Sequence, residues 1–302
     1  MYFYLLLTLW AGLHVDADAS CNLVQVRDVI QLGDRYFILD KGEYQVKVTG
    51  AQGELHHHFG RQGEGPGEFQ YPSAIGAVDG EIWVHDQIQS RIQRFTVQGQ
   101  YLGVHNISAL GPLQFEPEHL VLHTPTQAHA FIVLDRDVGE LGRVGEGMDA
   151  TGGVNVDQIS KYLQAYTTGA EGQTLFSLGV NGKRFATYDL KTMTQTSVRE
   201  LALDRYATSQ QVQHTGSGIR VSGNRPVKGT AFHEGHLFTL VIDETKAAQA
   251  RLVVLNDRGD VIQNQKLETF YNRIIPNPGH GSAFFLNVDE SLIEEKPLVL
   301  GR

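Results

Sequence analysis

Carboxylates that end short β-rich segments are the most regularly placed residues able to do chemistry. Segments such as YFILD, EIWVHD and AFIVLD all end in Asp. A ring of such side chains could bind a metal ion, but a carboxylate at the point where a strand enters a turn ordinarily accepts backbone N–H groups. We therefore interpret these residues as turn residues and expect neither a metal nor a cofactor. They are Asp40, Asp86, Asp135, Asp243 and Asp289.

Two groups of histidines also have spacings that suggest metal ligands. His56 to His58 are consecutive, so on a strand at most two of their side chains share a face. His233 and His236 flank a Glu-Gly pair that favours a hairpin turn, whereas the H-E-x-x-H zinc motif requires a helix. Neither group predicts a metal site, and no serine lies in a G-x-S-x-G elbow that would indicate nucleophilic catalysis.

The segment Leu203 to Val227, LDRYATSQQVQHTGSGIRVSGNRPV, is the least ordinary stretch of the chain and is rich in groups that bind ligands. Its aromatic, histidine and arginine side chains could stack on a ligand or bind carboxylates and sugars. A surface insertion without function fits the same pattern. The ligand-binding candidates in this segment and in a nearby glycine-rich loop are Arg61, Tyr206, His214, Arg220 and Arg225.

The elements that must position these residues form an internal repeat. The Asp-ending segments, together with TLFSLG, recur six times at intervals of 44 to 49 residues, with one interval of 64 that contains the insertion. Several short strands per repeat without an amphipathic helix are typical of a β-propeller blade. The sequence thus predicts an all-β, six-bladed propeller with about four antiparallel strands per blade, in which neighbouring blades bury each other's apolar faces.

The sixth repeat supplies only three clear strands, so we expect a strand from the beginning of the chain to complete it. NLVQV, residues Asn22 to Val26, precedes the first strand of blade one and is the segment that we expect to close the ring. Such a pairing would protect an open sheet edge.

The stretch GRQGEGPGEFQYP, from Gly60 to Pro72, could be a phosphate-binding loop or a corner. It has no Lys followed by Ser or Thr and no helix after it, and two glutamates would repel an anion. Glycines that adopt positive φ, with two prolines, suit a compact link between blades. We therefore interpret it as a corner.

The run from Phe59 to Gly103, FGRQGEGPGEFQYPSAIGAVDGEIWVHDQIQSRIQRFTVQGQYLG, resembles the NHL-type repeats of six-bladed β-propellers. The glycine-rich corner, a P-x-x-I strand, a DG-x-I-x-V-x-D strand and an RI-x-x-F hairpin carry the resemblance. Repeats one and five keep parts of this pattern, and the others depart from it. The resemblance implies the fold, while the functions of such propellers vary too widely to transfer.

The chain is acidic, with a formal net charge of -9 and no run of basic residues. Nucleic acid, which requires a basic surface, is therefore not an expected partner. We expect a monomer.

The first 19 residues are apolar through Leu13 and end in an Ala-Asp-Ala box, a pattern typical of a secretory signal peptide. Residues 20–302 then form one propeller domain, exported to the periplasm or the cell exterior. Cys21, the only cysteine, excludes an intrachain disulfide. It could instead carry a lipid, which would be the only reason to expect a membrane contact, or remain an ordinary thiol.

Two classes of function remain. The first is a non-catalytic binding propeller that presents one loop face to a protein, peptide or glycan. The alternative is a six-bladed propeller enzyme, such as a metal-dependent lactonase, another hydrolase, or a lyase. Such an enzyme needs Glu, Asp, Asn or His around the central channel, and the expected inner strands SAIGAV and HLVLH supply no such set. The sequence favours the binding module.

Overall fold

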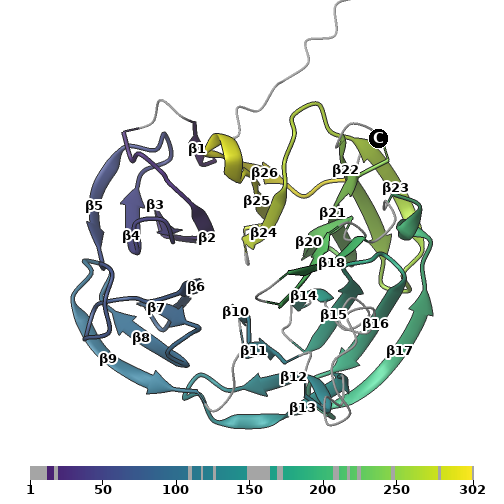
Figure 1. The fold of residues 1–302 in the computed structure, drawn as a ribbon, viewed down its shortest axis with the longest axis horizontal. Helices are drawn as coiled ribbons and strands as arrows, with labels where there is room; N and C mark the ends of the chain where they lie inside the picture. Colours follow the sequence, from purple (N-terminus) through teal and green to yellow (C-terminus); the bar gives the residue numbers. More distant parts are fainter. Residues whose placement is uncertain are drawn as a thin grey trace, which may run out of the picture.

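Six four-stranded antiparallel sheets surround a common axis in the computed structural model (Figure 1). The structure describes residues 12–16, 20–107, 111–116, 118–124, 127–147, 164–168, 173–206, 211–215, 218–222, 226–245, 249–277 and 280–300. The predicted all-β, six-bladed propeller is confirmed. No helix in these ranges is long and apolar enough to cross a membrane.

Each blade contains four strands, which are named in order from the axis outward. Blade one has β2 (Val26–Leu32), β3 (Arg35–Asp40), β4 (Gln45–Thr49) and β5 (Leu55–Phe59); blade two has β6 (Pro72–Val78), β7 (Glu81–Asp86), β8 (Arg91–Phe95) and β9 (Tyr101–Asn106); blade three has β10 (Leu113–Phe115), β11 (Leu120–His123), β12 (His129–Leu134) and β13 (Glu140–Glu146). Blade four has β14 (Gln164–Thr168), β15 (Thr174–Gly179), β16 (Arg184–Asp189) and β17 (Thr194–Glu200); blade five has β20 (Val227–His233), β21 (His236–Asp243), β22 (Gln249–Asn256) and β23 (Val261–Lys266); blade six has β24 (Arg273–Asn277), β25 (Ser282–Asn287), β26 (Leu292–Pro297) and β1 (His14–Val15).

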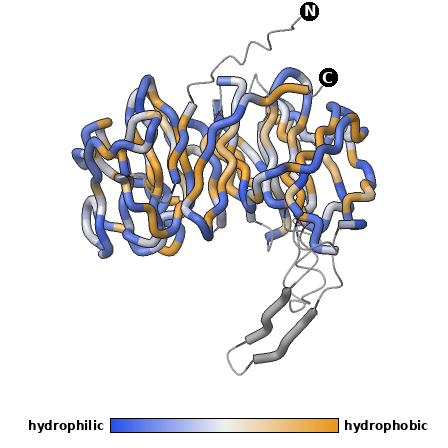
Figure 2. The backbone as a smooth tube through the Cα atoms, turned by 90° about the horizontal axis from the view of Figure 1, so that it is seen from above, coloured by the Kyte–Doolittle hydropathy of each residue, from blue (hydrophilic) through white to orange (hydrophobic). Residues whose placement is uncertain are grey.

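The hydrophobic cores lie between neighbouring blades. The second strand of a blade is apolar at nearly every position because both of its faces contact such a core. In β3, Tyr36 and Ile38 pack with residues of blade six such as Phe284. Phe37 and Leu39 face the other way and pack with residues of blade two. Because neighbouring side chains of a strand point to opposite faces, a sheet covered on both sides needs apolar residues at every position. Figure 2 shows the ring edge-on, with hydrophilic and apolar residues interleaved along the strands.

The ring has two faces, and the topology assigns each turn to one of them. The links from the outer strand of one blade to the inner strand of the next lie on the same face as the turns between second and third strands. We call this face the loop face. It carries the glycine corner, which joins β5 to β6, and the link from β17 to β20, which contains a short 3-10 helix, η2 (Leu203–Tyr206), and a separate hairpin of β18 (Gln211–Thr215) and β19 (Gly218–Ser222).

The glycine corner is held by its own backbone and by Glu68. The Phe69 N–H donates to Arg61 O, and the Gly63 N–H donates to Phe69 O. Gly60 has a φ of +92°, and a Cβ there would lie 2.5 Å from the Phe69 ring. Only glycine suits that position, since it needs both a left-handed backbone and the close approach of a buried ring.

Blade three departs from the expected register. Asp135 follows β12, the third strand of its blade, whereas Asp40 and Asp86 end second strands. All of β11 lies within HLVLH, which is therefore a second strand, not an inner one. The error has a physical origin, because a carboxylate after a third strand fits a turn equally well: Asp135 accepts the N–H groups of Asp137 and Gly139.

The strand that completes blade six is also not the expected one. β1 pairs with β26, with His14 opposite Glu294 and Val15 opposite Ile293. NLVQV does not pair with β26, and only its last residue belongs to a strand, β2. β1 lies inside the stretch that we expect to be a signal peptide, whose residues 1–11 and 17–19 fall outside the described ranges. Removal of residues 1–19 would take away this outer strand.

A buried carboxylate fixes the closure of the ring. Glu295 on β26 accepts hydrogen bonds from the Leu13 N–H next to β1 and from the Tyr36 hydroxyl in blade one. Its other oxygen accepts from the Asn277 amide and the Ser282 hydroxyl. One side chain therefore connects three strands of blade six with blade one.

Candidate functional site

Two cavities lie along the axis of the ring. The inner cavity has a volume of about 270 Å³, and the second has a volume of about 710 Å³. The second is lined by Lys41 and Asp289, which lie in turns of the loop face, so we call it the mouth cavity. Arg27, Tyr166 and Arg273 are among the residues that line both cavities, which form one central channel.

Three cationic side chains of this channel, Arg27, Lys228 and Arg273, lie at or next to the first residue of the innermost strand of their blades. Arg27 in β2 and Lys228 in β20 each occupy a bulge, where the pairing with the second strand skips one residue. Ser73 holds the equivalent bulge in β6. Bulges redirect side chains and occur next to functional sites. In this ring they bring long cationic side chains to the axis, and Arg273 joins them as the first residue of β24.

Arg273 is a half-buried cation that lies near Asp28 but forms no salt bridge with a described residue. Its Nη1 donates to the backbone oxygen of Arg27 at 2.5 Å, and the Arg27 Nε lies 3.4 Å from Ser73 O. Neither guanidinium forms a salt bridge in the part of the chain that the structure describes. Burial, and then the neighbouring charge of Arg27, lowers the pKa of Arg273 to about 10.

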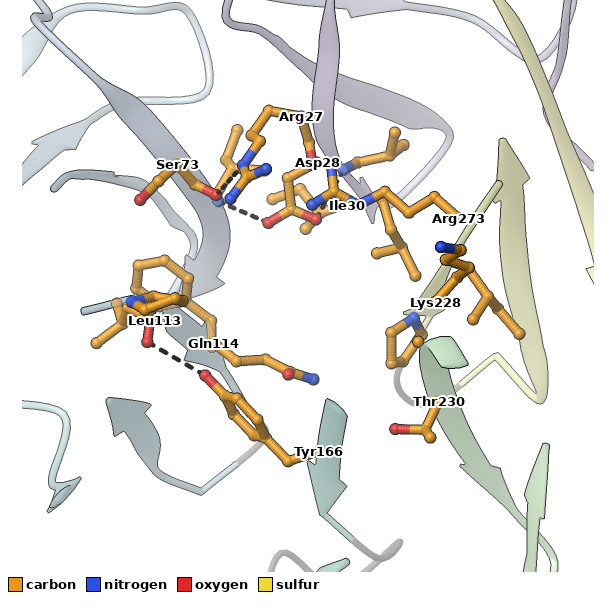
Figure 3. A pocket seen from close by; sticks show the side chains of 18 of the residues that line it. Arg27, Asp28, Ile30, Ser73, Leu113, Gln114, Tyr166, Lys228, Thr230 and Arg273 are labelled. Atoms are coloured by element: carbon orange, nitrogen blue, oxygen red, sulfur yellow. Dashed lines mark hydrogen bonds between the residues drawn. The ribbon is translucent and has the colours of Figure 1, made fainter. Parts of the chain in front are cut away.

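Asp28 is the carboxylate next to these arginines in the inner cavity (Figure 3). It accepts the N–H groups of Val29 and of Ile75 in the neighbouring blade, both at 3.0 Å. Burial raises the pKa of Asp28 to about 6, although these N–H groups and the charge of Arg273 oppose the shift. The carboxyl is therefore mainly ionised at pH 7.

Neutral polar groups line the opposite wall of the inner cavity. The Tyr166 hydroxyl lies 3.2 Å from both Pro112 O and Val121 O, so it is already engaged. The hydroxyl of Thr230, whose residue is 3% exposed, has no hydrogen-bond partner in the described structure. The Gln114 side chain likewise has no hydrogen bond to a described residue. Figure 3 shows both side chains beside the cavity.

Ser73 and His85 form a buried hydroxyl–imidazole pair that could suggest a nucleophile and its base. Ser73 Oγ lies 2.8 Å from His85 Nδ1. However, Figure 3 shows the Ser73 hydroxyl on the side away from the cavity, and His85 Nε2 has no orienting partner among the described residues. Burial lowers the pKa of His85 to about 4, so the ring is a weak base. This pair holds β6 to β7.

The ligand-binding residues expected from the sequence do not line this channel in the described structure. Arg61 is exposed and binds Glu68 through two nitrogens. Tyr206 is buried, accepts from the Asn264 amide at 2.6 Å and contacts Arg205. Those two residues stabilise loops. The backbones of His214 and Arg220 lie in the hairpin of β18 and β19, and Arg225 lies outside the described residues.

The turn aspartates make the backbone contacts that their positions imply, with one exception. Asp40 accepts the N–H groups of Val24 and Gln25, and Asp86 does the same for Gln70 and Tyr71. Asp243 accepts the Thr245 N–H. Asp289 instead accepts from the Asn272 side chain at 3.3 Å and lines the mouth cavity. No cluster of three or more His, Cys, Asp or Glu side chains suited to a metal occurs among the described residues.

Cys21 lies in the core between blades one and six and is 2% exposed. Burial raises the pKa of its thiol, which makes the thiolate scarcer. Attachment of a lipid would require this segment to leave the core.

Replacing Asp28 with asparagine should change the pH dependence of stability. A carboxyl whose pKa rises from 3.8 to about 6 on folding binds its proton more tightly in the folded state, so the native chain gains stability as the pH falls from 6 to 4 and bears the cost of the charge above pH 6. Relative to the wild type, D28N should therefore be more stable at pH 8 than at pH 4. The difference in the free energy of unfolding, D28N minus wild type, should be about 1–3 kcal/mol larger at pH 8. Urea denaturation between pH 4 and pH 8 measures this difference.

D34N, at an exposed turn, is the control for D28N. An equal difference between D28N and the wild type at both pH values would contradict the prediction.

Comparison with known proteins supports the fold. A family model described as a 6-bladed beta-propeller matches residues 13–134, from the residue before β1 to the end of β12. No curated protein matches the sequence.

Three similar solved structures are distant from this chain in sequence. A member of the duf4221 family from Bacteroides vulgatus has a TM-score of 0.58 at 13% identity, with 95% of this chain and 96% of that chain covered. A predicted exported protein from Bacteroides fragilis has a TM-score of 0.57 at 13% identity, over 90% and 82% of the two chains. Virginiamycin B lyase from Staphylococcus aureus has a TM-score of 0.54 at 10% identity, over 95% and 98%. At these identities the likeness concerns the fold alone.

Proposed function

We propose that the chain is an exported, non-catalytic binding propeller that takes an anionic ligand into the mouth of its central channel. The loop face remains the binding face expected from the sequence, but the site moves from the insertion to the axis. Peptides and glycans with acidic groups are the ligands that such a site could take.

The observation that supports this proposal most strongly is the pair of arginines at the axis of the ring. A buried charge without a partner is costly, and proteins normally pair it or remove it. Arg27 and Arg273 nevertheless lie together beside the single carboxylate of Asp28, and neither guanidinium forms a salt bridge with a described residue. Lys41 and Lys228 add two cations to the mouth cavity, where Asp289 also lies and where Glu244 is 3.8 Å from the Lys228 Nζ. On a chain of net charge -9, such a local excess of positive charge would attract an anion, to which arginine offers a planar fork of donors.

Titration calorimetry with acetate, citrate, sulfate and a short acidic peptide tests this proposal. We expect saturable binding of carboxylates that weakens as the salt concentration rises. The variant R27Q should bind about tenfold more weakly, because one charge-assisted hydrogen bond contributes about 1.5–3 kcal/mol. R61Q removes an exposed arginine outside the channel and should bind normally. Equal losses in both variants, or no binding of any anion, would refute the proposal.

Export rests on the leader-like pattern at the start of the sequence. The similar fold of a predicted exported protein from Bacteroides fragilis agrees with it. The mass of the N-terminal peptide of the protein from its native host tests this part independently, and an intact Met1 would contradict it.

A further inference from the structure

The walls of the inner cavity differ in what they offer a ligand. One wall carries Arg27 and Arg273, which only donate hydrogen bonds, next to Asp28, which when ionised only accepts them. The other carries the Thr230 hydroxyl and the Gln114 amide, which do both. A ligand that is complementary to all of them needs an anionic group and several neutral donors and acceptors.

Asp28 argues against a simple anion. A carboxylate beside the arginines would repel a second negative charge of the ligand, whereas it can accept a hydrogen bond from a ligand hydroxyl. Two of its lone pairs are used by the Val29 and Ile75 N–H groups, and a carboxylate has about four acceptor sites. The ligand should therefore carry its charge at one end and a hydroxyl close to it.

Thr230 provides an independent observation. Thr230 lines the inner cavity, and its buried hydroxyl has no partner in the described structure, although buried polar groups are normally paired. Phe115 contributes an apolar surface to the same cavity. The mouth cavity, with a volume of about 710 Å³, lies in the range of small-ligand pockets, and the inner cavity, with about 270 Å³, lies just below it.

From these features we propose that the ligand is a polyhydroxylated carboxylate of monosaccharide size, a sugar acid, free or at the end of a glycan. Its carboxylate binds Arg27 and Arg273, one hydroxyl donates to Asp28, and further hydroxyls pair with Thr230 and Gln114. This inference rests on the proposed function and specifies its ligand.

Calorimetry with galacturonate, galactose and cyclohexanecarboxylate tests the ligand class, because these probes share a six-membered ring and differ in charge and hydroxyl groups. Galacturonate should bind at least tenfold more tightly than cyclohexanecarboxylate, and galactose should not bind measurably. The variant T230V should weaken galacturonate three- to tenfold and leave cyclohexanecarboxylate unchanged.

T239V is the matched control. Thr239 lies opposite Thr230 on β21 and also has a buried hydroxyl without a described partner, but it is not among the residues that line the cavity. It should bind galacturonate normally, and thermal unfolding would show that both variants are folded.

The outcomes separate the two proposals. Equal affinity for galacturonate and cyclohexanecarboxylate, with no effect of T230V, overturns the sugar-acid inference and leaves anion binding intact. Tighter binding of galactose 1-phosphate or of a peptide carboxylate also overturns it. If no carboxylate or other anion binds, both proposals fall.

Discussion

Replacing Glu295 with alanine should lower the free energy of unfolding by about 3–5 kcal/mol, because it leaves several buried donors without an acceptor. The carboxylate accepts from the Leu13 N–H, the Tyr36 and Ser282 hydroxyls and the Asn277 amide. All of these groups lie at the junction where the chain's first strand meets its last blade. Glutamine keeps the shape of the side chain but supplies only one acceptor oxygen. E295Q should therefore lower the free energy of unfolding by less than E295A does.

Urea denaturation, followed by the fluorescence of the buried Trp83, would measure these differences. E200A, which removes an exposed glutamate at the end of an outer strand, should be within about 0.5 kcal/mol of the wild type. A loss below about 1 kcal/mol in E295A would show that the closure does not depend on this carboxylate.

Replacing Arg273 with methionine should have opposite effects on stability and binding. Without ligand, the variant should be more stable by about 1–2 kcal/mol, because an apolar side chain replaces a half-buried charge that forms no salt bridge with a described residue. Its affinity for carboxylates should fall at least 30-fold, since a charged donor pair is lost. A residue kept for binding at the expense of stability shows this combination.

R94M is the control for this pair of effects. Arg94 has a carboxylate partner, with its Nε 3.0 Å from Glu81, and does not line either cavity. Its replacement should leave binding unchanged and should not raise stability. If R273M lowers stability and leaves binding intact, Arg273 is a structural residue and the site lies elsewhere.

The blade pattern was readable from the sequence because both faces of each sheet are buried. Strands such as YFILD must then be continuously apolar, and their end is marked by a residue that binds the turn. The same rule failed in blade three, where the run AFIVL before Asp135 belongs to a third strand. The closing strand was missed because β1 has only two residues, too few for any periodicity, and lies within an apolar leader-like stretch.

The sequence did not predict the channel site that we propose, for a different reason. A long polar insertion is typical of a binding loop, so the pattern favours Arg220 and Arg225 over charged residues inside strands. A signal was nevertheless present: Arg27 precedes Asp40 by the same 13 residues that separate Ser73 from Asp86. An arginine in an inner strand, at a position where another blade has serine, is costly unless it serves a site. The bulge that turns it toward the axis, and its proximity to Arg273 from the far end of the chain, required the structure.

A crystal structure of the protein with the carboxylate that binds most tightly in calorimetry tests the central claim most directly. Our account predicts the ligand in the central channel, with its carboxylate within hydrogen-bond distance of the guanidinium groups of Arg27 and Arg273. A ligand bound to the hairpin of β18 and β19 or to the outer strands, with only water between the two arginines, would contradict it.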